Sequence, residues 1–373
     1  MGEIFPDRAA AEFEANFEAG REVGAAMSVW RDGVEVVSCV GGFRDRAKHE
    51  AWGAETLVPV WSATKGPAAA CVMRCLDEAG LTPETRVAEI WPEFARAGKA
   101  DVTVGQVMSH TAGMGALRCE GLSLFDHPAV AGALADQEPF AEAIGRVAYG
   151  PRTVGFLMDE IVRRLTGGTL GSYWRRCFGD PMNLDFWMGL PESEDGRVAT
   201  MLAPRSAGDL ADRFIRAFSD PSSLTRRAFS EPRGLVPVSS INRPEARRAS
   251  IPSMGGIGTA SALAKFYCEL ACGRGVSGRV CEWMAERRSG GMDLVLCAET
   301  AFSAGFLMNP VEGVGEPLMG PSERAFGHPG AGGSLAFADP GNRLGFAYVM
   351  NQMEPGVLPG GRARRLVDAL FGL

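Results

Sequence analysis

The sequence predicts a mixed α/β (α+β) fold. In this fold an antiparallel sheet flanked by helices is built from both ends of the chain, and a helical domain is inserted between them. Strand patterns bounded by turn residues begin at residue 24 and return after residue 300, whereas the segments between about 80 and 240 read mainly as short helices and loops. We therefore expect a mixed α/β domain from residues 1–75 and 245–373, and a helical domain from 76–244.

The first strands and the first buried helix have clear turn and cap signals. "GAAMSVWRDGVEVVSCVGG", from residue 24, contains two strand-like stretches separated by Asp32-Gly33, which is a strong hairpin signal. "PAAACVMRCLDEAG", from residue 67, is apolar on most faces and stops at Gly80, as a buried helix with a glycine C-cap does. The N-terminal part therefore starts the sheet and then enters a helix.

The middle of the chain carries helical patterns. We expect a helix over "TVGFLMDEIVRRLTGG", from about residue 153, and another over "SAGDLADRFIRAF", with Ser206 as its N-cap. The stretch 217–253 is rich in Pro, Ser and Arg and is the expected long loop.

Strand patterns complete the sheet near the C-terminus. They are "FSAGFLMN", "GSLAFADP" and "RLGFAYVMN", and a Pro-Gly-Asn turn joins the last two. The segment "RARRLVDALFGL" predicts a terminal helix.

Composition excludes several classes of partner. The chain has 373 residues, of which 46% are hydrophobic and 22% charged, as in soluble globular proteins. Its net charge is −7, and no basic cluster with interleaved aromatic residues appears, so we expect no nucleic-acid partner. The N-terminus is acidic and amphipathic, and no stretch of about 18 apolar residues occurs, so neither a membrane segment nor a secretory signal is expected.

The cysteines predict a reducing compartment. Nine cysteines, an odd number, are scattered through mostly apolar contexts, which favours the cytoplasm. Cys71 and Cys75 are four residues apart, as are Cys268 and Cys272, so each pair would share one helix face. Because neither pair has a nearby histidine or a second close pair, we expect core packing and no metal site.

The segment "VWSATKG" places Ser62 three residues before Lys65. A serine hydroxyl becomes a good nucleophile when a neighbour within hydrogen-bond reach takes its proton. On the first turn of a helix, Ser62 and Lys65 would face the same spot, and the positive helix end would favour a neutral lysine. Arginine cannot take this role because it stays protonated. Only four lysines occur beside 34 arginines, and no other serine has a lysine three positions on. The motif alone also fits a plain helix start.

Three further motifs follow in order: "VTVGQVMSHTAGM", "YGPRTVGFLMDEIVRRLTG" and "GHPGAGGSLAFADP". Together with "VWSATKGPAAACV" they resemble the serine β-lactamase and penicillin-binding-protein superfamily, and most closely its family VIII carboxylesterases and other class C-like hydrolases. The resemblance spans residues 20 to 352. It implies a β-lactamase/transpeptidase-like fold with the active site in the cleft between the two domains.

The resemblance also implies roles for single residues. Ser62 would be the acylated serine and Lys65 its partner, and Tyr149, on a loop before a helix, would share proton transfer. A phenol can act as a base only if a neighbouring lysine cation lowers its pKa. Without the resemblance, Tyr149 would read as a core tyrosine. By analogy, the Ala331 N–H pairs with the Ser62 N–H as an oxyanion hole, and Gly330 lets a substrate approach the backbone closely.

Two positions depart from the family pattern. His328-Pro329-Gly330 stands where the third motif is usually Lys-Thr-Gly. A lysine there offers a permanent charge to a substrate carboxylate, whereas a histidine of ordinary pKa is mostly neutral at pH 7. Pro151 stands where lactamases have the Asn of Tyr-Ser-Asn. Both departures favour ester over β-lactam substrates, with His328 and Gly330 at the substrate site.

The expected activity is that of a serine carboxylesterase that cleaves short-chain esters through an acyl-enzyme, with neither a metal nor another cofactor. A weak β-lactamase, a D-stereospecific peptidase or amidase, and an acyltransferase are alternatives on the same fold. A non-catalytic relative that binds peptides or sugars is a further one. The expected partner is a small-molecule ester, and the sequence makes no prediction of the oligomeric state.

Two other motifs receive a structural interpretation. His110 in "MSHTAGM" suggests a Ser-His pair with Asp101 or Asp126 as a third member. A histidine at a helix end is more often packed and hydrogen-bonded, so we expect structural support under the cleft. "GGIGTASALAKF", at 255–266, lacks the third glycine of a dinucleotide fingerprint and is expected to be a loop that enters a helix.

Overall fold

A computed structural model describes residues 2–205, 212–311, 315–358 and 360–373 of the chain. The strands in this part are β1 (Gly24–Arg31), β2 (Val34–Gly42), β3 (Val58–Pro59), β4 (Phe186–Met188), β5 (Gly256–Gly258), β6 (Ser289–Met292), β7 (Glu299–Phe302), β8 (Leu307–Met308), β9 (Phe326–Pro329), β10 (Leu335–Asp339) and β11 (Leu344–Met350). The α-helices are α1 (Pro6–Glu18), α2 (Lys65–Glu78), α3 (Val87–Ile90), α4 (Val104–Met108), α5 (His127–Asp136), α6 (Thr153–Thr166), α7 (Leu170–Trp174), α8 (Asp212–Ser219), α9 (Leu224–Ser230), α10 (Pro244–Arg248), α11 (Ala260–Ala271), α12 (Gly278–Ala285) and α13 (Gly361–Phe371).

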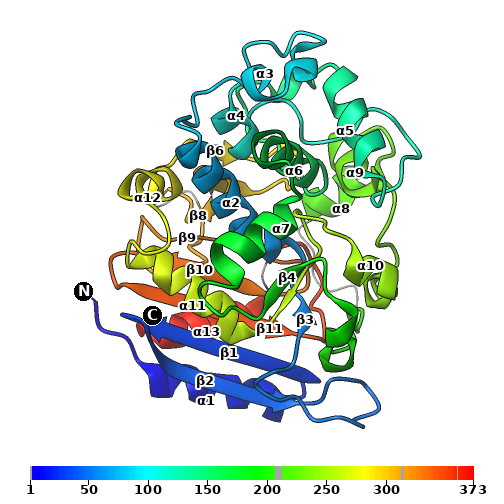
Figure 1. Ribbon diagram of the computed structural model, residues 1–373. Helices are drawn as coiled ribbons and strands as arrows, with labels where there is room; N and C mark the ends of the chain where they lie inside the picture. Colours follow the sequence, from blue (N-terminus) through cyan, green and yellow to red (C-terminus); the bar gives the residue numbers. More distant parts are fainter. Residues whose placement is uncertain (1, 206–211, 312–314, 359) are drawn as a thin grey trace.

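The larger sheet joins the two ends of the chain. Within the described residues it has eight strands in the order β2-β1-β11-β10-β9-β8-β7-β6. Each pair of neighbours is antiparallel. Strand β1 pairs with β2 on one side and with β11 on the other, so the N-terminal hairpin and the C-terminal strands form one surface (Figure 1). The predicted mixed α/β fold with a sheet built from both chain ends is confirmed.

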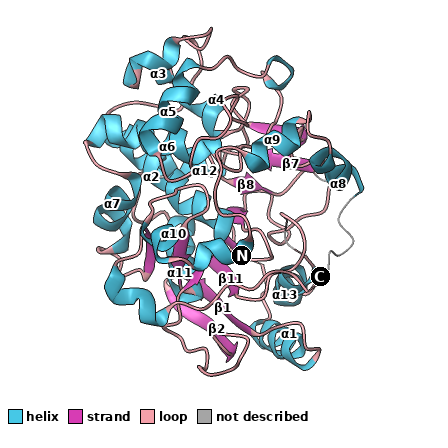
Figure 2. Ribbon diagram, turned by 90° about the vertical axis from the view of Figure 1, so that its right-hand side faces the viewer, coloured by secondary structure: helices cyan, strands magenta, loops and turns pink. Residues whose placement is uncertain are grey.

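Helices cover both faces of this sheet at its β2-β1-β11 end. On one face, Trp30 Nε1 donates a hydrogen bond to Ser261 Oγ of α11 (3.2 Å), and a side chain at Gly345, opposite Trp30, would collide with the α11 backbone. On the other face, Gly41 lies against Phe17 of α1, and α13 packs beside α1. Figure 2 shows α11 on one side of these strands and α1 and α13 on the other. All seven residues of β11 are therefore buried, which explains their continuous apolar pattern.

The segment between the two sheet-forming parts is mainly helical, as predicted. Helix α2 rises from the sheet region and packs against α6, α7 and α12 (Figure 1). A small sheet in the order β3-β5-β4 lies at the base of α2. Strand β3 is separated by five residues from α2, which begins at Lys65, with one short turn between them, so this small sheet holds the start of α2 in place.

The predicted turn between the first two strands and the predicted helix boundaries are confirmed. Asp32 and Gly33 both have positive φ (53° and 85°), as a tight turn between β1 and β2 requires. Gly80 has φ +71° just after α2, and α6 begins at Thr153. Positive φ is readily adopted by glycine, so the turn and helix-end signals were accurate here.

Three expectations about loops and strands were wrong. "FSAGFLMN" is not one strand, because Gly305 at φ +94° turns the chain between β7 and β8. The stretch 217–253 is not a plain loop, since it contains α9 and α10. "GGIGTASALAKF" enters a helix, α11, as expected, but Gly256–Gly258 form strand β5 instead of a loop, and a Cβ at Gly256 would lie 2.5 Å from the Phe186 ring. Ser206, the expected N-cap before α8, lies outside the described residues.

Candidate active site

Ser62 lies on a 3₁₀ turn, η1 (Trp61–Thr64), that leads directly into α2. The sequence suggested the first turn of an α-helix, and the difference is small in effect, because i and i+3 side chains eclipse on a 3₁₀ turn. The Ser62 side chain is half-buried, whereas Lys65, the first residue of α2, is 1% exposed. Trp61 has φ +50°, a conformation rare for a non-glycine residue and frequent at functional sites.

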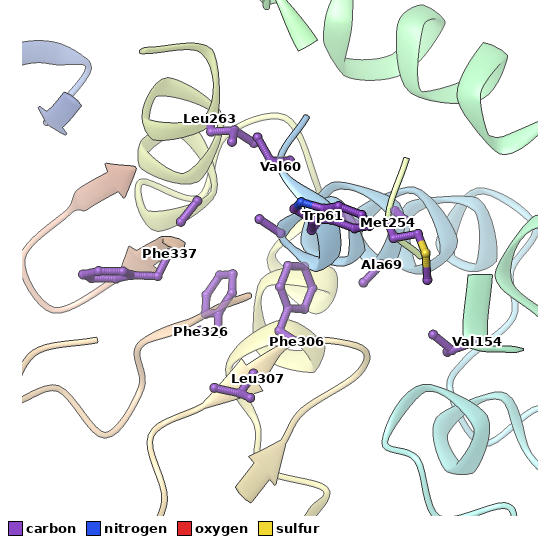
Figure 3. Close-up of a cluster of buried hydrophobic side chains, with 14 of the residues drawn as sticks. Val60, Trp61, Ala69, Val154, Met254, Leu263, Phe306, Leu307, Phe326 and Phe337 are labelled. Carbon is purple, nitrogen blue, oxygen red and sulfur yellow. The ribbon is translucent and has the colours of Figure 1, made fainter. Parts of the chain in front are cut away.

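Hydrogen bonds from the small sheet hold this strained turn. The Val60 N–H donates to Gly256 O of β5 (2.9 Å), and the Gly256 N–H donates to the Thr64 hydroxyl (2.8 Å). The Thr64 hydroxyl in turn donates to Trp61 O (2.5 Å). Figure 3 shows Val60 and Trp61 at the start of α2 within a cluster of buried apolar side chains. The small sheet, helix α2 and the apolar core thus all fix the position of Ser62.

The Lys65 amine is surrounded by three oxygen atoms. Its Nζ lies 3.1 Å from Ser62 Oγ, 3.0 Å from Pro151 O and 2.7 Å from Ser253 O. No carboxylate of the described residues forms an ion pair with it. Burial, and after it the charge of Arg152, holds the pKa of Lys65 well below its ordinary value of 10.5. The lysine therefore sits within reach of the serine in an environment that favours its neutral form.

Tyr149 lies on the loop before α6, as predicted, and its ring faces Lys65. The Lys65 Nζ is 4.9 Å from the ring centroid. Two other rings stack on the phenol, that of Phe302 with centroids 6.1 Å apart and that of His328 at 5.8 Å. Burial raises the pKa of Tyr149, and a hydrogen bond with Ser62 offsets this only in part. The phenol therefore lacks the lowered pKa that a role as a base would require, and it keeps its proton at neutral pH.

Asp293, just after β6, accepts a hydrogen bond from the Tyr149 backbone N–H. It is fully buried, and its Oδ1 accepts hydrogen bonds from the N–H groups of Tyr149 (3.2 Å), Val295 (2.8 Å) and Leu296 (3.0 Å). Burial raises the pKa of Asp293, and these donors oppose the rise. Asp293 thus ties the Tyr149 loop to the segment that follows β6.

The turn after β9 packs against the segment before Ser62. The Ser334 hydroxyl donates to Val60 O (2.9 Å), and a Cβ at Gly330 would lie 2.1 Å from that same oxygen. Strand β9 ends at Pro329, so Ala331 lies in the β9–β10 turn rather than on a strand. Glycine at 330 therefore allows this turn to approach the Ser62 segment.

His328 is a neutral member of this group. It is 2% exposed, and its Nδ1 lies 2.7 Å from Pro329 O, which assigns the ring proton to Nδ1. Burial, together with the charge of Lys65, lowers the pKa of His328 well below 6.5. The position of the usual lysine therefore carries no positive charge at neutral pH.

His110 has the supporting place that the sequence suggested. Its Nδ1 accepts a hydrogen bond from the Gly150 N–H (3.2 Å), and its ring packs edge-on against Tyr149. Burial lowers the pKa of His110 to about 3. Asp101 forms an ion pair with Arg86 and Asp126 caps α5, so neither makes a triad with His110.

Sequence reasoning missed three contributors to the site. Ser253 acts through its backbone carbonyl, which leaves no signal in its side chain. Asp293 lies in an ordinary loop, and only the fold brings it under Tyr149. Arg152 directly follows "YGP". The only sequence signal for its burial is that it stands just before the apolar start of α6. Tertiary contacts bring Ser253 to Lys65 and Asp293 to Tyr149, whereas Arg152 is adjacent in the chain to Pro151, which Lys65 contacts.

The described residues contain no group of three or more His, Cys, Asp or Glu side chains arranged to hold a metal ion. Among the same residues, no helix is both long and apolar enough to cross a bilayer. The nine cysteines are all unpaired, and Cys71 and Cys75 are buried in the core as expected.

The fold and the serine–lysine pair define a serine hydrolase of the β-lactamase fold. The chain belongs to the beta-lactamase family, whose model matches residues 10–371. The resemblance to the β-lactamase and penicillin-binding-protein superfamily is thereby confirmed.

Several relatives share nearly the whole chain. The esterase/beta-lactamase LipL of Mycobacterium tuberculosis is 32% identical over 361 residues, covering 91% of this chain and 80% of that protein. A penicillin-binding protein homolog from Caulobacter crescentus is 37% identical with a TM-score of 0.85 over 98% of both chains. A family VIII carboxylesterase is 34% identical with a TM-score of 0.87 over 99% of both chains.

The role of Asp293 predicts different outcomes for two substitutions. Asp293→Ala leaves three buried N–H groups without their acceptor, and each such group costs about 1–3 kcal/mol. We expect the variant to lose at least about 3 kcal/mol of unfolding free energy in urea titrations and to have a lower kcat. Asp293→Asn keeps an acceptor oxygen and should lose much less of both. Equal losses in the two variants would contradict this role.

Proposed function

We propose that the protein hydrolyses short-chain carboxylic esters through an acyl-enzyme on Ser62, with Lys65 as the base and Tyr149 as a proton donor. The observation that carries the proposal is the set of contacts of Lys65. A neutral amine has two N–H groups and one lone pair. Pro151 O and Ser253 O are acceptors for the two N–H groups, which leaves the lone pair for the Ser62 hydroxyl at 3.1 Å.

Acylation begins when the Ser62 hydroxyl gives its proton to Lys65 Nζ as Oγ attacks the ester carbonyl carbon. The carbonyl π electrons move to oxygen and form a tetrahedral oxyanion. When the oxyanion collapses, the bond to the alcohol oxygen breaks, and that oxygen takes the phenolic proton of Tyr149. Lys65 then returns its proton to Tyr149, so both groups end in their starting states.

The oxyanion is held by the backbone N–H groups of Ser62 and Ala331 in this proposal. The packing of the Gly330 turn against Val60 supports it, because this contact brings the turn next to the Ser62 segment. An oxyanion-hole donor of this kind typically contributes about 3–4 kcal/mol to transition-state stabilisation.

Deacylation reverses the proton path. A water molecule attacks the acyl carbon and passes a proton to the Tyr149–Lys65 pair, and Ser62 Oγ leaves with a proton from the same pair. Lys65 can repeat this step because burial keeps its neutral form accessible.

We propose that the reaction takes place in the cleft between the sheet-forming and helical domains. We also propose that the protein acts in the cytoplasm, because nine unpaired cysteines are compatible with a reducing environment.

The neutral His328 supports esters as substrates. A β-lactam carboxylate needs a cation at the third motif, and a histidine with its pKa well below 6.5 offers none at pH 7. Pro151 also offers only a backbone carbonyl, already used by Lys65, where an amide side chain would be needed. A simple ester requires neither contact.

We expect that Ser62→Ala abolishes hydrolysis of p-nitrophenyl butyrate, since loss of the nucleophile in a serine protease lowers kcat on the order of 10⁶-fold. Lys65→Arg should lower kcat at least about 100-fold although it keeps a cation, because arginine cannot accept the proton. Lys265→Arg is the matched control: Lys265 donates to Met182 O, away from the site, and its loss should leave kcat unchanged. A tenth of wild-type activity in Ser62→Ala would contradict the proposal.

The pH dependence follows from the direction of two pKa shifts. The base must be neutral, so kcat/KM rises with pH through the pKa of Lys65 and then levels off, and this limb lies well below pH 10.5. Tyr149 keeps its proton up to pH 10, because burial raises its pKa, so no descending limb is expected below that pH. A profile without an ascending limb anywhere in the pH range over which the protein stays folded would contradict Lys65 as the base.

Weak β-lactam hydrolysis is a second candidate, because the relative LipL carries both esterase and beta-lactamase in its name. We expect kcat/KM to be higher for p-nitrophenyl butyrate than for nitrocefin. His328→Lys restores the cation of the usual motif and should raise the nitrocefin rate relative to the ester rate. A wild-type preference for nitrocefin would make β-lactams the primary substrate.

A further inference from the structure

Arg152 is a buried cation that is not in direct contact with a carboxylate of the described residues. It is 5% exposed and precedes α6, and its Nη1 donates hydrogen bonds to two backbone carbonyls, Pro232 O (2.7 Å) and Gly234 O (2.9 Å). It makes no ion pair with a described carboxylate. Buried charges in proteins are normally paired, because an isolated charge is strongly penalised away from water. An arrangement of this kind requires a reason.

The chain connects this cation to the proposed base. Arg152 directly follows Pro151, whose carbonyl accepts a hydrogen bond from Lys65 Nζ (3.0 Å). The Thr153 hydroxyl donates to Met114 O (2.7 Å) and fixes the next residue of the same segment. The guanidinium and the amine are therefore held in neighbouring buried sites by one rigid stretch of chain.

Two neighbouring buried groups cannot both carry a positive charge without a large penalty. Arginine keeps its proton in proteins, and burial lowers the pKa of Arg152 only to about 10. Lysine shifts readily when buried, so it is the lysine that gives up its proton. The nearby charge of Arg152 adds to the effect of burial on the pKa of Lys65.

We propose that Arg152 is a positioning residue whose unpaired guanidinium keeps Lys65 in the neutral form that can accept the serine proton. This inference rests on the proposed function and deepens it. The two carbonyl contacts at Pro232 and Gly234 hold the guanidinium in place. A carboxylate would neutralise its charge, and these carbonyls do not. The cation therefore acts on the base through space and touches no substrate.

The other charged and titratable groups around Lys65 do not replace this cation. His110 and His328 are neutral, and Tyr149 keeps its proton. The nearby carboxylates are Asp293, under Tyr149, and Glu231, on the loop that Arg152 binds. Glu231 raises the pKa of Arg152, but its oxygens accept hydrogen bonds from the Gly121 N–H (3.0 Å) and from Arg233 Nε (3.1 Å).

The test is the pH profile of kcat/KM on p-nitrophenyl butyrate in Arg152→Gln. This variant keeps N–H donors for the two carbonyls and removes the charge. Because a neighbouring like charge shifts a pKa by about one unit or more, the ascending limb should move up by about one pH unit. The high-pH plateau should stay within a few-fold of the wild type. An unshifted limb with a lowered plateau would show that Arg152 only tethers the loop, and would overturn the proposal.

A matched control separates charge from structure. Arg175 also donates to two backbone carbonyls, Leu184 O (2.8 Å) and Phe186 O (3.3 Å), and is not among the charges that act on Lys65. Arg175→Gln should leave the ascending limb where it is in the wild type. A limb shift of the same size as in Arg152→Gln would overturn the proposal.

A second variant keeps the proposal testable if Arg152→Gln does not fold. Glu231→Gln removes the carboxylate whose charge acts on Arg152, so the limb should stay in place or move to lower pH, and a move to higher pH would contradict the proposal. A wild-type protein without ester turnover would contradict the proposed function itself. A wild-type protein that turns esters over, with an unshifted limb in Arg152→Gln, would contradict only the role of Arg152.

Discussion

The burial of the Lys65 amine is the constraint on which the rest of the site depends. An ammonium group enclosed in protein without a carboxylate is unstable, so the amine is pushed toward its neutral form, and only a neutral amine can take a proton from Ser62. The two carbonyls of Pro151 and Ser253 orient this amine without stabilising its charge as a carboxylate would. The dipoles of these two carbonyls take the place of water around the Lys65 amine, and the nitrogen lone pair is left to face the Ser62 hydroxyl.

The fold brings several distant parts of the chain together around Lys65. The elements that meet at Lys65 come from distant parts of the sequence: the start of α2, the loop before α6, the segment before β5 and the end of β9. The antiparallel sheet joins the two chain ends, and α2 rises from it into the helical region. An amine enclosed in this way requires packing from several sides, which a single hairpin or helix pair does not supply.

Much of this arrangement could be predicted from sequence because it depends on local signals. The Asp32-Gly33 turn and the glycine after α2 report their backbone conformation directly. The spacing of Ser62 and Lys65 predicted that their side chains face each other, and Lys65 Nζ lies 3.1 Å from Ser62 Oγ; Tyr149 was proposed from the family resemblance. The 217–253 stretch was misjudged because its helices are short and lack strong apolar periodicity, so packing rather than propensity decides them.

Other parts of the site could not be read from the sequence for physical reasons. A backbone carbonyl such as Ser253 O carries no residue-type signal, and Asp293 looks like any loop aspartate until the sheet brings it under Tyr149. The direction of the Tyr149 pKa shift depends on burial, which the sequence does not report. The electrostatic state of a buried group is a property of the whole fold.

The central claim is that neutral Lys65 activates Ser62 and no other serine. It is tested most directly by the rate and site of covalent labelling with a fluorophosphonate, followed by intact mass and peptide mapping at several pH values. We expect one adduct per chain, on the peptide that contains Ser62, with a rate that rises with pH in the wild type and is nearly abolished in Lys65→Met. Labelling of a different serine, or labelling of Ser62 at an equal rate in Lys65→Met, would contradict it.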